Sequence, residues 1–254
     1  MINRDSLIAF INKTVNFEPQ KDPYLYNSVQ VIGKDEVQKI ALGVSANLEL
    51  FQKAATWGAE MIILHHGLLG PIIKEPITRV LKNRLKVLFD HDITLLTYHL
   101  FLDNHPTLGN NAQIIKRLGA KRGTAFGLMD NLYWGWEGKF TKAISISELM
   151  DRVKKLCGLG VKVFKYGSEK IKRIGVVSGG GPYLLAEAIE KNLDAFITGE
   201  VKESTEAQAK EAGIHYIYLG HYNSETFGIK ALGEFIKKKY PELQIKFVDI
   251  PNPI

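Results

Sequence analysis

The sequence predicts an α/β protein built from two similar halves. Two observations support this fold class: an internal repeat in which strands alternate with helices, and short continuous apolar runs, which are typical of strands covered by helices on both faces. Strands that alternate with helices indicate βαβ units and a parallel sheet. We therefore expect two halves related by a pseudo-twofold axis, each with a mainly parallel sheet flanked by helices. The first half would span residues 1–124 and the second residues 125–254.

The repeat aligns residues 37–45 with residues 171–179, an offset of 134. It continues without a gap into the next helix and strand. The clearest matches are Ile40 with Ile174, Ala54 with Ala188, Glu60 with Asp194 and Ile63 with Ile197. Each copy indicates a strand, a Ser/Gly turn, an amphipathic helix and a second strand. The helices are expected at 48–57 and 182–191, and the second strands at 61–64 and 195–198.

Each copy continues with another helix and a third apolar strand, which ends near His99 in the first half and near His221 in the second. Further helices are expected at 111–118 and 226–237.

The segment that joins the halves also has a predicted structure. It carries an expected strand at 135–140, followed by a helix. We expect Ser147 to be the N-cap of this helix, because serine is a preferred capping residue and Glu148 then falls in the first turn.

Composition limits the classes of function. The formal net charge of +6 would favour anionic partners. The lysines are dispersed, however, so we expect an anionic small molecule rather than nucleic acid. No apolar run approaches the roughly 18 residues that a membrane span needs, so we expect no membrane partner. The N-terminus lacks the features of a signal peptide, which predicts a cytoplasmic protein. Cys157 is the single cysteine, which excludes a thiolate metal cluster within one chain.

Histidines beside carboxylates give the strongest functional signal. The pair His65-His66 closes an apolar run, at the carboxyl end of a predicted strand, where ligands bind in open α/β sheets. Two His-x-x-x-acid elements follow the third strands of the halves, and they are His99/Asp103 and His221/Glu225. Imidazoles and carboxylates are the ligands of divalent metal ions such as Zn, Mn, Fe or Ni. The sequence therefore predicts a metal site between the halves.

The number of donors favours two metal ions. An open catalytic zinc site usually has three protein ligands, whereas five strong donors suit two cations bridged by a carboxylate. These donors are His65, His66, Asp103, His221 and Glu225. Adjacent residues of a strand point to opposite faces. His65 and His66 therefore meet at one site only if the strand has ended, which Gly67 would permit, or they serve two neighbouring metals.

Three further features have more than one interpretation. His99 could be a metal ligand, a hydrogen-bond partner of a ligand or a proton shuttle. Glu200 lies at the position equivalent to His66, where it could act as a base, orient a ligand or form a salt bridge. The segment 178–182, Ser-Gly-Gly-Gly-Pro, matches neither a P-loop nor the GxGxxG motif. We interpret it as a tight turn rather than as a phosphate site.

Six segments of the chain carry a resemblance to a known family. They are NSVQVIG, IILHHG, TYHLFLDNHPTLGNNAQI, FITGEVKESTEAQAKEAG, LGHYNSETFGIKAL and FVDIPNPI. Together they resemble the Nif-three-like dinuclear metal-centre family, whose members are often named GTP cyclohydrolase I type 2 or its homologues. The chain is most similar to the short bacterial branch, which lacks an inserted domain.

The resemblance implies the same five metal ligands, with Glu225 as the bridge between two divalent ions. Gly67 stands where many members have proline, which should alter the loop more than the ligands. The resemblance also implies a homo-oligomer, a ring-shaped hexamer whose metal sites face an internal cavity.

For function, the resemblance implies a metal-dependent hydrolase of a nucleotide-like small molecule, with GTP ring opening as the named reaction. A fold and a metal site do not establish a reaction, so a non-catalytic metal chaperone, buffer or scaffold is the alternative. The net charge prompts a third interpretation, a nucleic-acid-associated ring, which salt-sensitive DNA binding would support.

Overall fold

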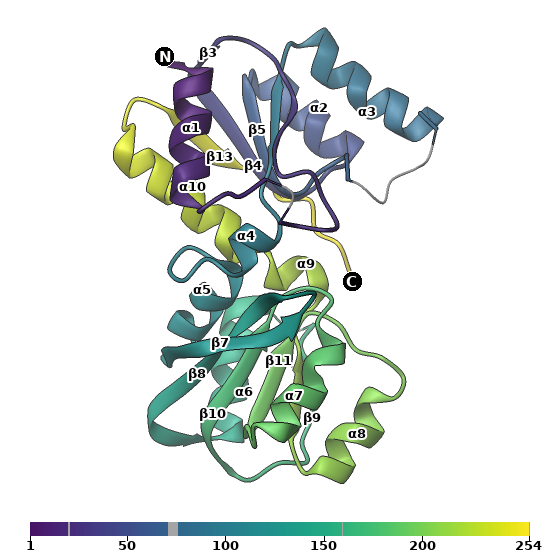
Figure 1. Ribbon diagram of the computed structural model, residues 1–254, viewed down its shortest axis with the longest axis vertical. Helices are drawn as coiled ribbons and strands as arrows, with labels where there is room; N and C mark the ends of the chain where they lie inside the picture. The colour runs from purple at the N-terminus through teal and green to yellow at the C-terminus, as the bar shows by residue number, and fades with distance from the viewer. Residues whose placement is uncertain (20, 71–75, 159, 254) are drawn as a thin grey trace. The chain divides into compact units, whose positions relative to one another are not determined.

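The computed structural model describes residues 1–19, 21–70, 76–158 and 160–253 (Figure 1). The chain is confirmed as an α/β protein, with helices packed on mixed sheets. Its contacts divide it into two compact units. The first unit contains Met1–His105 and Ile229–Ile250, and the second contains Pro106–Gly228 and Pro251–Ile254.

This division differs from the predicted boundary at residues 124 and 125. The helix α5 (Asn110–Arg117) packs against strands of the second unit. The C-terminal strand β13 (Gln244–Phe247) pairs with a strand of the first unit. A linear repeat could not reveal this return of the chain, because strand pairing between residues about 200 positions apart leaves no local sequence pattern.

The first unit is built on a five-stranded sheet in the order β13-β4-β5-β6-β2. Its first four strands are parallel and β2 is antiparallel at the edge. The strands besides β13 are β2 (Ser28–Val31), β4 (Lys39–Ser45), β5 (Met61–His66) and β6 (Thr94–Thr97). A short ribbon pairs β1 (Ile2–Asn3) with β3 (Glu36–Val37).

Helices cover both faces of this sheet (Figure 1). One face carries α1 and α10, which are joined by stacking of Phe10 on Phe235 at 5.9 Å. The other face carries α2 and α3. The helices are α1 (Arg4–Thr14), α2 (Leu48–Trp57), α3 (Arg79–Asp90), α4 (Leu100–Asp103) and α10 (Thr226–Lys239), which begins in the second unit. Burial on both faces explains why residues 61–64 form a continuous apolar run, since none of their side chains reaches solvent.

The second unit has a six-stranded sheet in the order β7-β8-β10-β11-β12-β9. The strands are β7 (Lys121–Met129), β8 (Leu132–Ser145), β9 (Lys162–Phe164), β10 (Lys170–Val177), β11 (Ala195–Thr198) and β12 (His215–Tyr218). Only β10, β11 and β12 are mutually parallel among these described strands. The expectation of a mainly parallel sheet is therefore correct for the first unit and wrong for the second, because the β7–β8 hairpin and β9 add antiparallel pairs.

Helices also cover both faces of the second sheet. One apolar cluster lies under α5 and α6, and another under α7 and α8. Besides α5, the described helical elements of this unit are α6 (Ile146–Cys157), a 3-10 turn (Pro182–Leu184), α7 (Leu185–Glu190), α8 (Thr205–Ala212) and α9 (His221–Ser224). Among the residues that the structure describes, no helix is both long and apolar enough to cross a membrane.

The repeat is confirmed within the two units at the level of strand register. Ile40 lies opposite Met61, and Ile174 lies opposite Ala195, so the aligned residues have the same partners. One carboxylate in each copy also makes the same contacts. Glu60 Oε2 accepts hydrogen bonds from the N–H groups of residues 38 and 39, at 3.1 and 2.7 Å. Asp194 Oδ2 accepts from those of residues 172 and 173, both at 2.7 Å.

Local predictions were accurate in the type of each element and less accurate in its bounds. The strand expected at 135–140 spans Leu132–Ser145, and the strand expected at 61–64 continues to His66. The helix at 48–57 and the strand at 195–198 have their predicted bounds. The helix expected at 182–191 begins instead as a 3-10 turn. The N-cap of α6 is Ser145 rather than Ser147, because the Ser145 side chain accepts a hydrogen bond from Glu148 N–H at 3.1 Å. Ser145 and Glu148 have the spacing of a capping box. The prediction of Ser147 as the N-cap did not take this spacing into account.

We expect Asp194→Ala to free the amides of Lys172 and Arg173. Loss of two hydrogen bonds to a charged acceptor should destabilise this region by about 2 kcal/mol. Amide hydrogen exchange measured by NMR should then accelerate at both residues. Asp194→Asn, which retains an oxygen acceptor, serves as the control and should show a smaller acceleration. Unchanged exchange in the alanine variant would contradict the assigned role.

Candidate metal centre

Two adjacent histidines lie at the carboxyl end of β5. The strand does not end before them, because His66 still pairs in register with Ser45 of β4. The two rings nevertheless lie close together, with centroids 4.6 Å apart and planes tilted by 44°. Gly67 has no positive φ, and the strand has not ended where the two histidines meet. Gly67 allows close packing instead, since a Cβ there would lie 2.3 Å from Thr97 Oγ1.

His99 completes a cluster of three imidazoles in the first unit. Its ring centroid lies 5.2 Å from that of His65 and 5.4 Å from that of His66. Each residue offers a ligand atom, and these atoms all lie within 4.8 Å of one another. Asp103 extends the cluster, because its Oδ2 lies 3.3 Å from His65 Nε2. The first unit thus gathers three imidazoles and one carboxylate from β5, the end of β6 and α4.

The backbone sets the protonation of His65, whose side chain is fully buried. Its Nδ1 lies 3.0 Å from the carbonyl oxygen of Tyr98, which can only accept, so Nδ1 carries the proton. Nε2 then faces the Asp103 carboxylate at 3.3 Å. An imidazole nitrogen and a carboxylate oxygen this close can share one divalent cation, so this donor set fits a metal ion.

Asp22 contacts the histidine cluster, and sequence reasoning missed it. Its Oδ2 lies 2.9 Å from His99 Nδ1 and accepts that proton. Oδ1 accepts hydrogen bonds from the N–H groups of Tyr24 and Leu25, at 2.8 and 3.3 Å. Burial raises the pKa of Asp22, but hydrogen bonds from His99 and Asn27 outweigh it and lower the pKa to about 2. An aspartate before Pro23 was readable as a turn residue, but its pairing with His99, 77 positions away, was not.

The two His-x-x-x-acid elements have different geometry. In the first unit Asp103 pairs with His65 rather than with its own His99. In the second unit His221 Nε2 lies 3.2 Å from Oε1 of its own Glu225. The cause is an offset of one residue: His99 is the N-cap of α4, whereas Gly220, at φ 90°, is the N-cap of α9.

His221 lies between two carboxylates. Its Nδ1 is 2.6 Å from Glu200 Oε1, on the side of the ring opposite to the buried Glu225. Burial alone would lower the pKa of His221, but hydrogen bonds and charge attraction from Glu225 and Glu200 outweigh it and raise the pKa to about 9. This contact places Glu200 where it can orient the imidazole.

The Ser-Gly-Gly-Gly-Pro segment is confirmed as a tight turn, and it lies against Glu225. Gly179 has φ 62°, and a Cβ there would lie 2.2 Å from Glu225 Oε1. The Gly179 N–H donates to Ser224 Oγ at 2.9 Å, which ties the turn to α9. Glycine at this position therefore leaves room for the carboxylate.

The remaining histidines lie outside these clusters. His215 is structural, because Nε2 donates to Ser168 O at 2.8 Å and Nδ1 accepts from Gly167 N–H at 3.2 Å. His105 Nε2 donates to Thr14 O, and His91 is exposed at the end of α3. Cys157 is no candidate nucleophile, since burial raises the pKa of its thiol to about 12.

We expect the Asp22 carboxylate to stabilise the folded protein in a pH-dependent way. A depressed pKa contributes stability above the usual value near 3.8, and this contribution is lost as the pH falls through about 2. At pH 7, Asp22→Asn should therefore lower the free energy of unfolding by about 2 kcal/mol. Denaturant titrations should show this difference shrinking below pH 4. Asp90→Asn, at an exposed ion pair, is the control and should change little.

Gly179→Ala should lower the free energy of unfolding more than Gly213→Ala does. Gly213, at φ 65°, is the matched control, because a Cβ there meets nothing closer than Tyr166 O at 3.8 Å. Gly213→Ala should cost about 1 kcal/mol of unfolding free energy for the backbone alone. Gly179→Ala should cost about 2 kcal/mol more, since the added methyl overlaps Glu225. Equal losses of unfolding free energy in the two variants would contradict the close packing of Gly179 against Glu225.

Comparison with known proteins identifies the family of the chain. The family model of Duf34/NIF3 (NGG1p interacting factor 3) matches residues 2–253. A relative from Escherichia coli (strain K12), named GTP cyclohydrolase 1 type 2 homolog, is 38% identical over 251 residues, covering 97% of this chain and 98% of its own. A relative of the same name from Archaeoglobus fulgidus is 33% identical and covers 99% of both chains.

Solved structures share the fold over the whole chain. Protein ybgI, described as of unknown function, has a TM-score of 0.92 and 35% identity, with 100% of both chains covered. TTHA1606 from Thermus thermophilus has a TM-score of 0.88 and 31% identity, also with 100% of both chains covered. The resemblance seen in the sequence is thereby confirmed, and the chain belongs to the Duf34/NIF3 family.

Proposed function

We propose that the protein is a dinuclear-metal-dependent hydrolase of a nucleotide-like small molecule, with GTP as the first candidate substrate. One observation carries the proposal: His65, His66 and His99 gather their ligand atoms within 4.8 Å at the carboxyl ends of parallel strands. This is the edge of an α/β sheet at which ligands bind. The name of the E. coli and A. fulgidus relatives supports the choice of GTP.

The proposed metal ligands come from both units. They are His65, His66, Asp103, His221 and Glu225. Three are imidazoles and two are carboxylates, a mixed set that suits Zn, Mn, Fe or Ni. We propose two divalent ions, with Glu225 as the bridging carboxylate. When bound, such ions activate a water molecule and polarise an oxygen of the substrate.

The chain itself supplies the orienting and proton-transfer groups. Asp22 holds the Nδ1 proton of His99, so Nε2 is the nitrogen that can accept a proton from a reacting group. Glu200 holds the Nδ1 proton of His221 and directs Nε2 towards Glu225. We therefore assign His99 and Glu200 as the catalytic candidates, His99 as a proton shuttle and Glu200 as a base that also orients His221.

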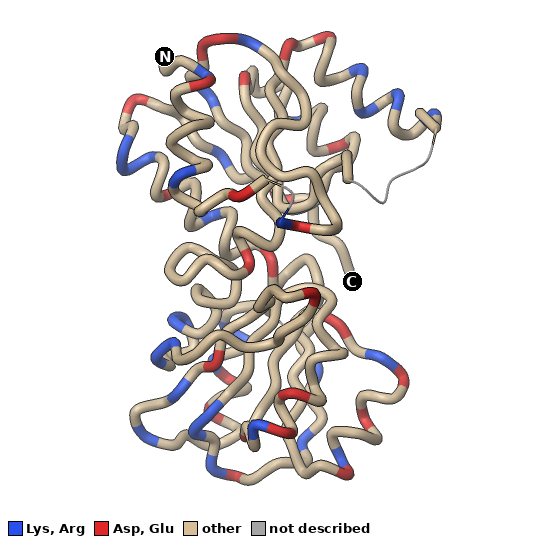
Figure 2. Tube along the Cα trace, in the orientation of Figure 1, with Lys and Arg blue, Asp and Glu red and all other residues tan. Residues whose placement is uncertain are grey.

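The proposed partners follow from charge and family. Lys and Arg are interspersed with Asp and Glu along the chain of each unit (Figure 2), and this dispersal favours a small anionic substrate over nucleic acid. We also propose a ring-shaped homohexamer, which the family resemblance implies, and a cytoplasmic location, which the absence of signal-peptide features in the N-terminus predicts.

Metal analysis of the purified protein tests the ligands. The protein should hold about two divalent ions per chain, as two-metal hydrolases do. His65→Ala and Glu225→Ala should each lower the metal content by at least about half, since each removes a ligand. His91→Ala removes an exposed histidine outside the clusters and is the matched control. Full metal content in both ligand variants would contradict the proposed ligands.

The same proteins test the reaction. Metal-loaded protein should convert GTP to a ring-opened product, detected by chromatography, and the His91→Ala control should retain this activity. His65→Ala and Glu225→Ala should lose it. No product at high protein concentration with Mn, Zn, Fe and Ni each supplied would reject GTP as substrate. Intact metal binding together with rapid transfer of metal to an acceptor protein would favour a metal chaperone or buffer.

A further inference from the structure

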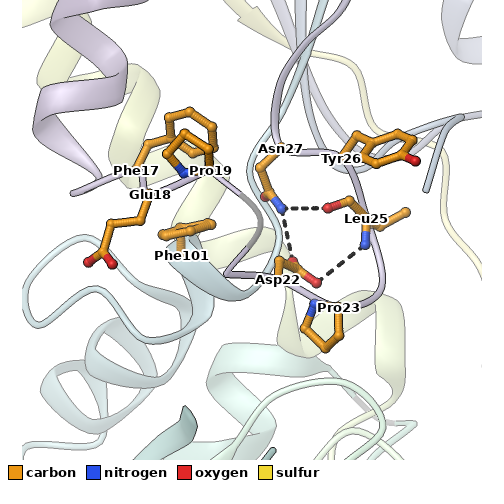
Figure 3. A pocket seen from close by; sticks show the side chains of 9 residues that line it. All are labelled: Phe17, Glu18, Pro19, Asp22, Pro23, Leu25, Tyr26, Asn27 and Phe101. Carbon is orange, nitrogen blue, oxygen red and sulfur yellow. Dashed lines mark hydrogen bonds between the residues drawn. The ribbon is translucent and has the colours of Figure 1, made fainter. Parts of the chain in front are cut away.

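The first unit contains a pocket beside, but distinct from, the histidine cluster. It has a volume of about 520 Å³ and lies between the segment that precedes β2 and the start of α4 (Figure 3). Sites for small organic molecules commonly measure about 300–1,000 Å³. Among the described residues, none of the three clustered histidines lines the pocket. A molecule bound in this pocket would therefore not occupy the site formed by these histidines.

The walls of the pocket are flat and apolar. Phe17 and Phe101 meet edge to face, with ring centroids 5.5 Å apart and an angle of 64° between the planes. Leu25 and two prolines complete the apolar surface. Tyr26 stands at the rim, where 56% of its surface is exposed. Aromatic faces and edges of this kind bind planar rings by stacking and edge-to-face contact.

The charge of the lining discriminates between ligands. Its described residues include the carboxylates of Glu18 and Asp22 but no lysine or arginine. Lys21 pairs with Glu18 at 2.9 Å and offsets part of that charge. An anionic ligand would find no cation among the described lining residues, whereas a neutral or cationic ligand meets no repulsion.

The pocket is preformed by the hydrogen bonds of Asp22. The carboxylate accepts from the N–H groups of Tyr24 and Leu25 and from Asn27 Nδ2, which lies 3.0 Å from Oδ2. Asn27 Nδ2 also donates to Leu25 O at 2.9 Å. These bonds hold the loop that forms one wall (Figure 3). A preformed wall lowers the entropy lost on binding.

We propose that this pocket binds a planar heteroaromatic ring that is neutral or positively charged. The proposal is independent of the proposed hydrolase activity, because the pocket is formed without any metal ligand. It assigns residues 22–27 a binding role beyond the orientation of His99.

Three probes with one ring system test the proposal on the full-length protein. Indole is neutral, tryptamine is cationic and indole-3-acetate is anionic. Ligand-observed NMR and competition titrations should show binding of indole and tryptamine, with tryptamine about tenfold tighter than indole-3-acetate. Tyr26→Ala and Phe101→Ala should each weaken tryptamine binding by several-fold to about tenfold, through loss of ring contacts. Phe89→Ala, at an exposed aromatic outside the pocket, is the matched control.

The measurement separates this site from the metal centre. Binding should persist in metal-free protein and in His65→Ala, so failure of the metal proposal would leave it intact. Tyr26→Ala changes an exposed side chain and keeps the test informative if Phe101→Ala fails to fold. Tightest binding of indole-3-acetate, no binding of any probe at millimolar concentration, or equal tryptamine binding in Tyr26→Ala and Phe89→Ala would each overturn the proposal.

Discussion

The candidate metal residues depend on one recurring constraint: an oxygen atom holds the Nδ1 nitrogen of each imidazole. That oxygen is the Tyr98 carbonyl for His65, the Asp22 carboxylate for His99 and the Glu200 carboxylate for His221. Each contact orients the ring, so that Nε2 of His65 and of His221 faces a carboxylate and Nε2 of His99 is the nitrogen proposed for proton transfer. His66 Nδ1 also contacts an oxygen, Ser45 Oγ at 3.0 Å, but this hydroxyl can donate or accept and therefore does not set the tautomer. Burial strengthens the His65 contact most, because this side chain is fully buried and water does not compete for the same atoms.

The repeat shows how one framework produces unequal halves. The carboxylates Glu60 and Asp194 accept equivalent amide hydrogen bonds, so the strand register is preserved in both copies. The ends of the strands differ, because His65-His66 in the first copy corresponds to Gly199-Glu200 in the second. The backbone framework is thus common to both units, while the donor atoms are specific to each.

Glycine controls how closely these elements approach. Gly67 admits Thr97 Oγ1, and Gly179 admits the Glu225 carboxylate. Gly199 belongs to the same arrangement, since a Cβ there would lie 2.7 Å from Ser224 Oγ and from Gly179 O. Side chains at these positions would displace the very groups that hold or orient the candidate ligands. Close packing is therefore part of the chemistry of the site.

The sequence by itself determined the α/β class, the repeat and most of the histidines of the candidate metal centre. These features are local: an apolar run, a helix period or a histidine after a strand is visible in a few consecutive residues. Tertiary structure alone decided the rest. It paired Asp22 with His99, paired Asp103 with His65 rather than with His99, and returned β13 to the first sheet. The physical reason is that these contacts join distant residues through side-chain direction and strand register, and a one-residue offset at Gly220 is enough to change which carboxylate meets which imidazole.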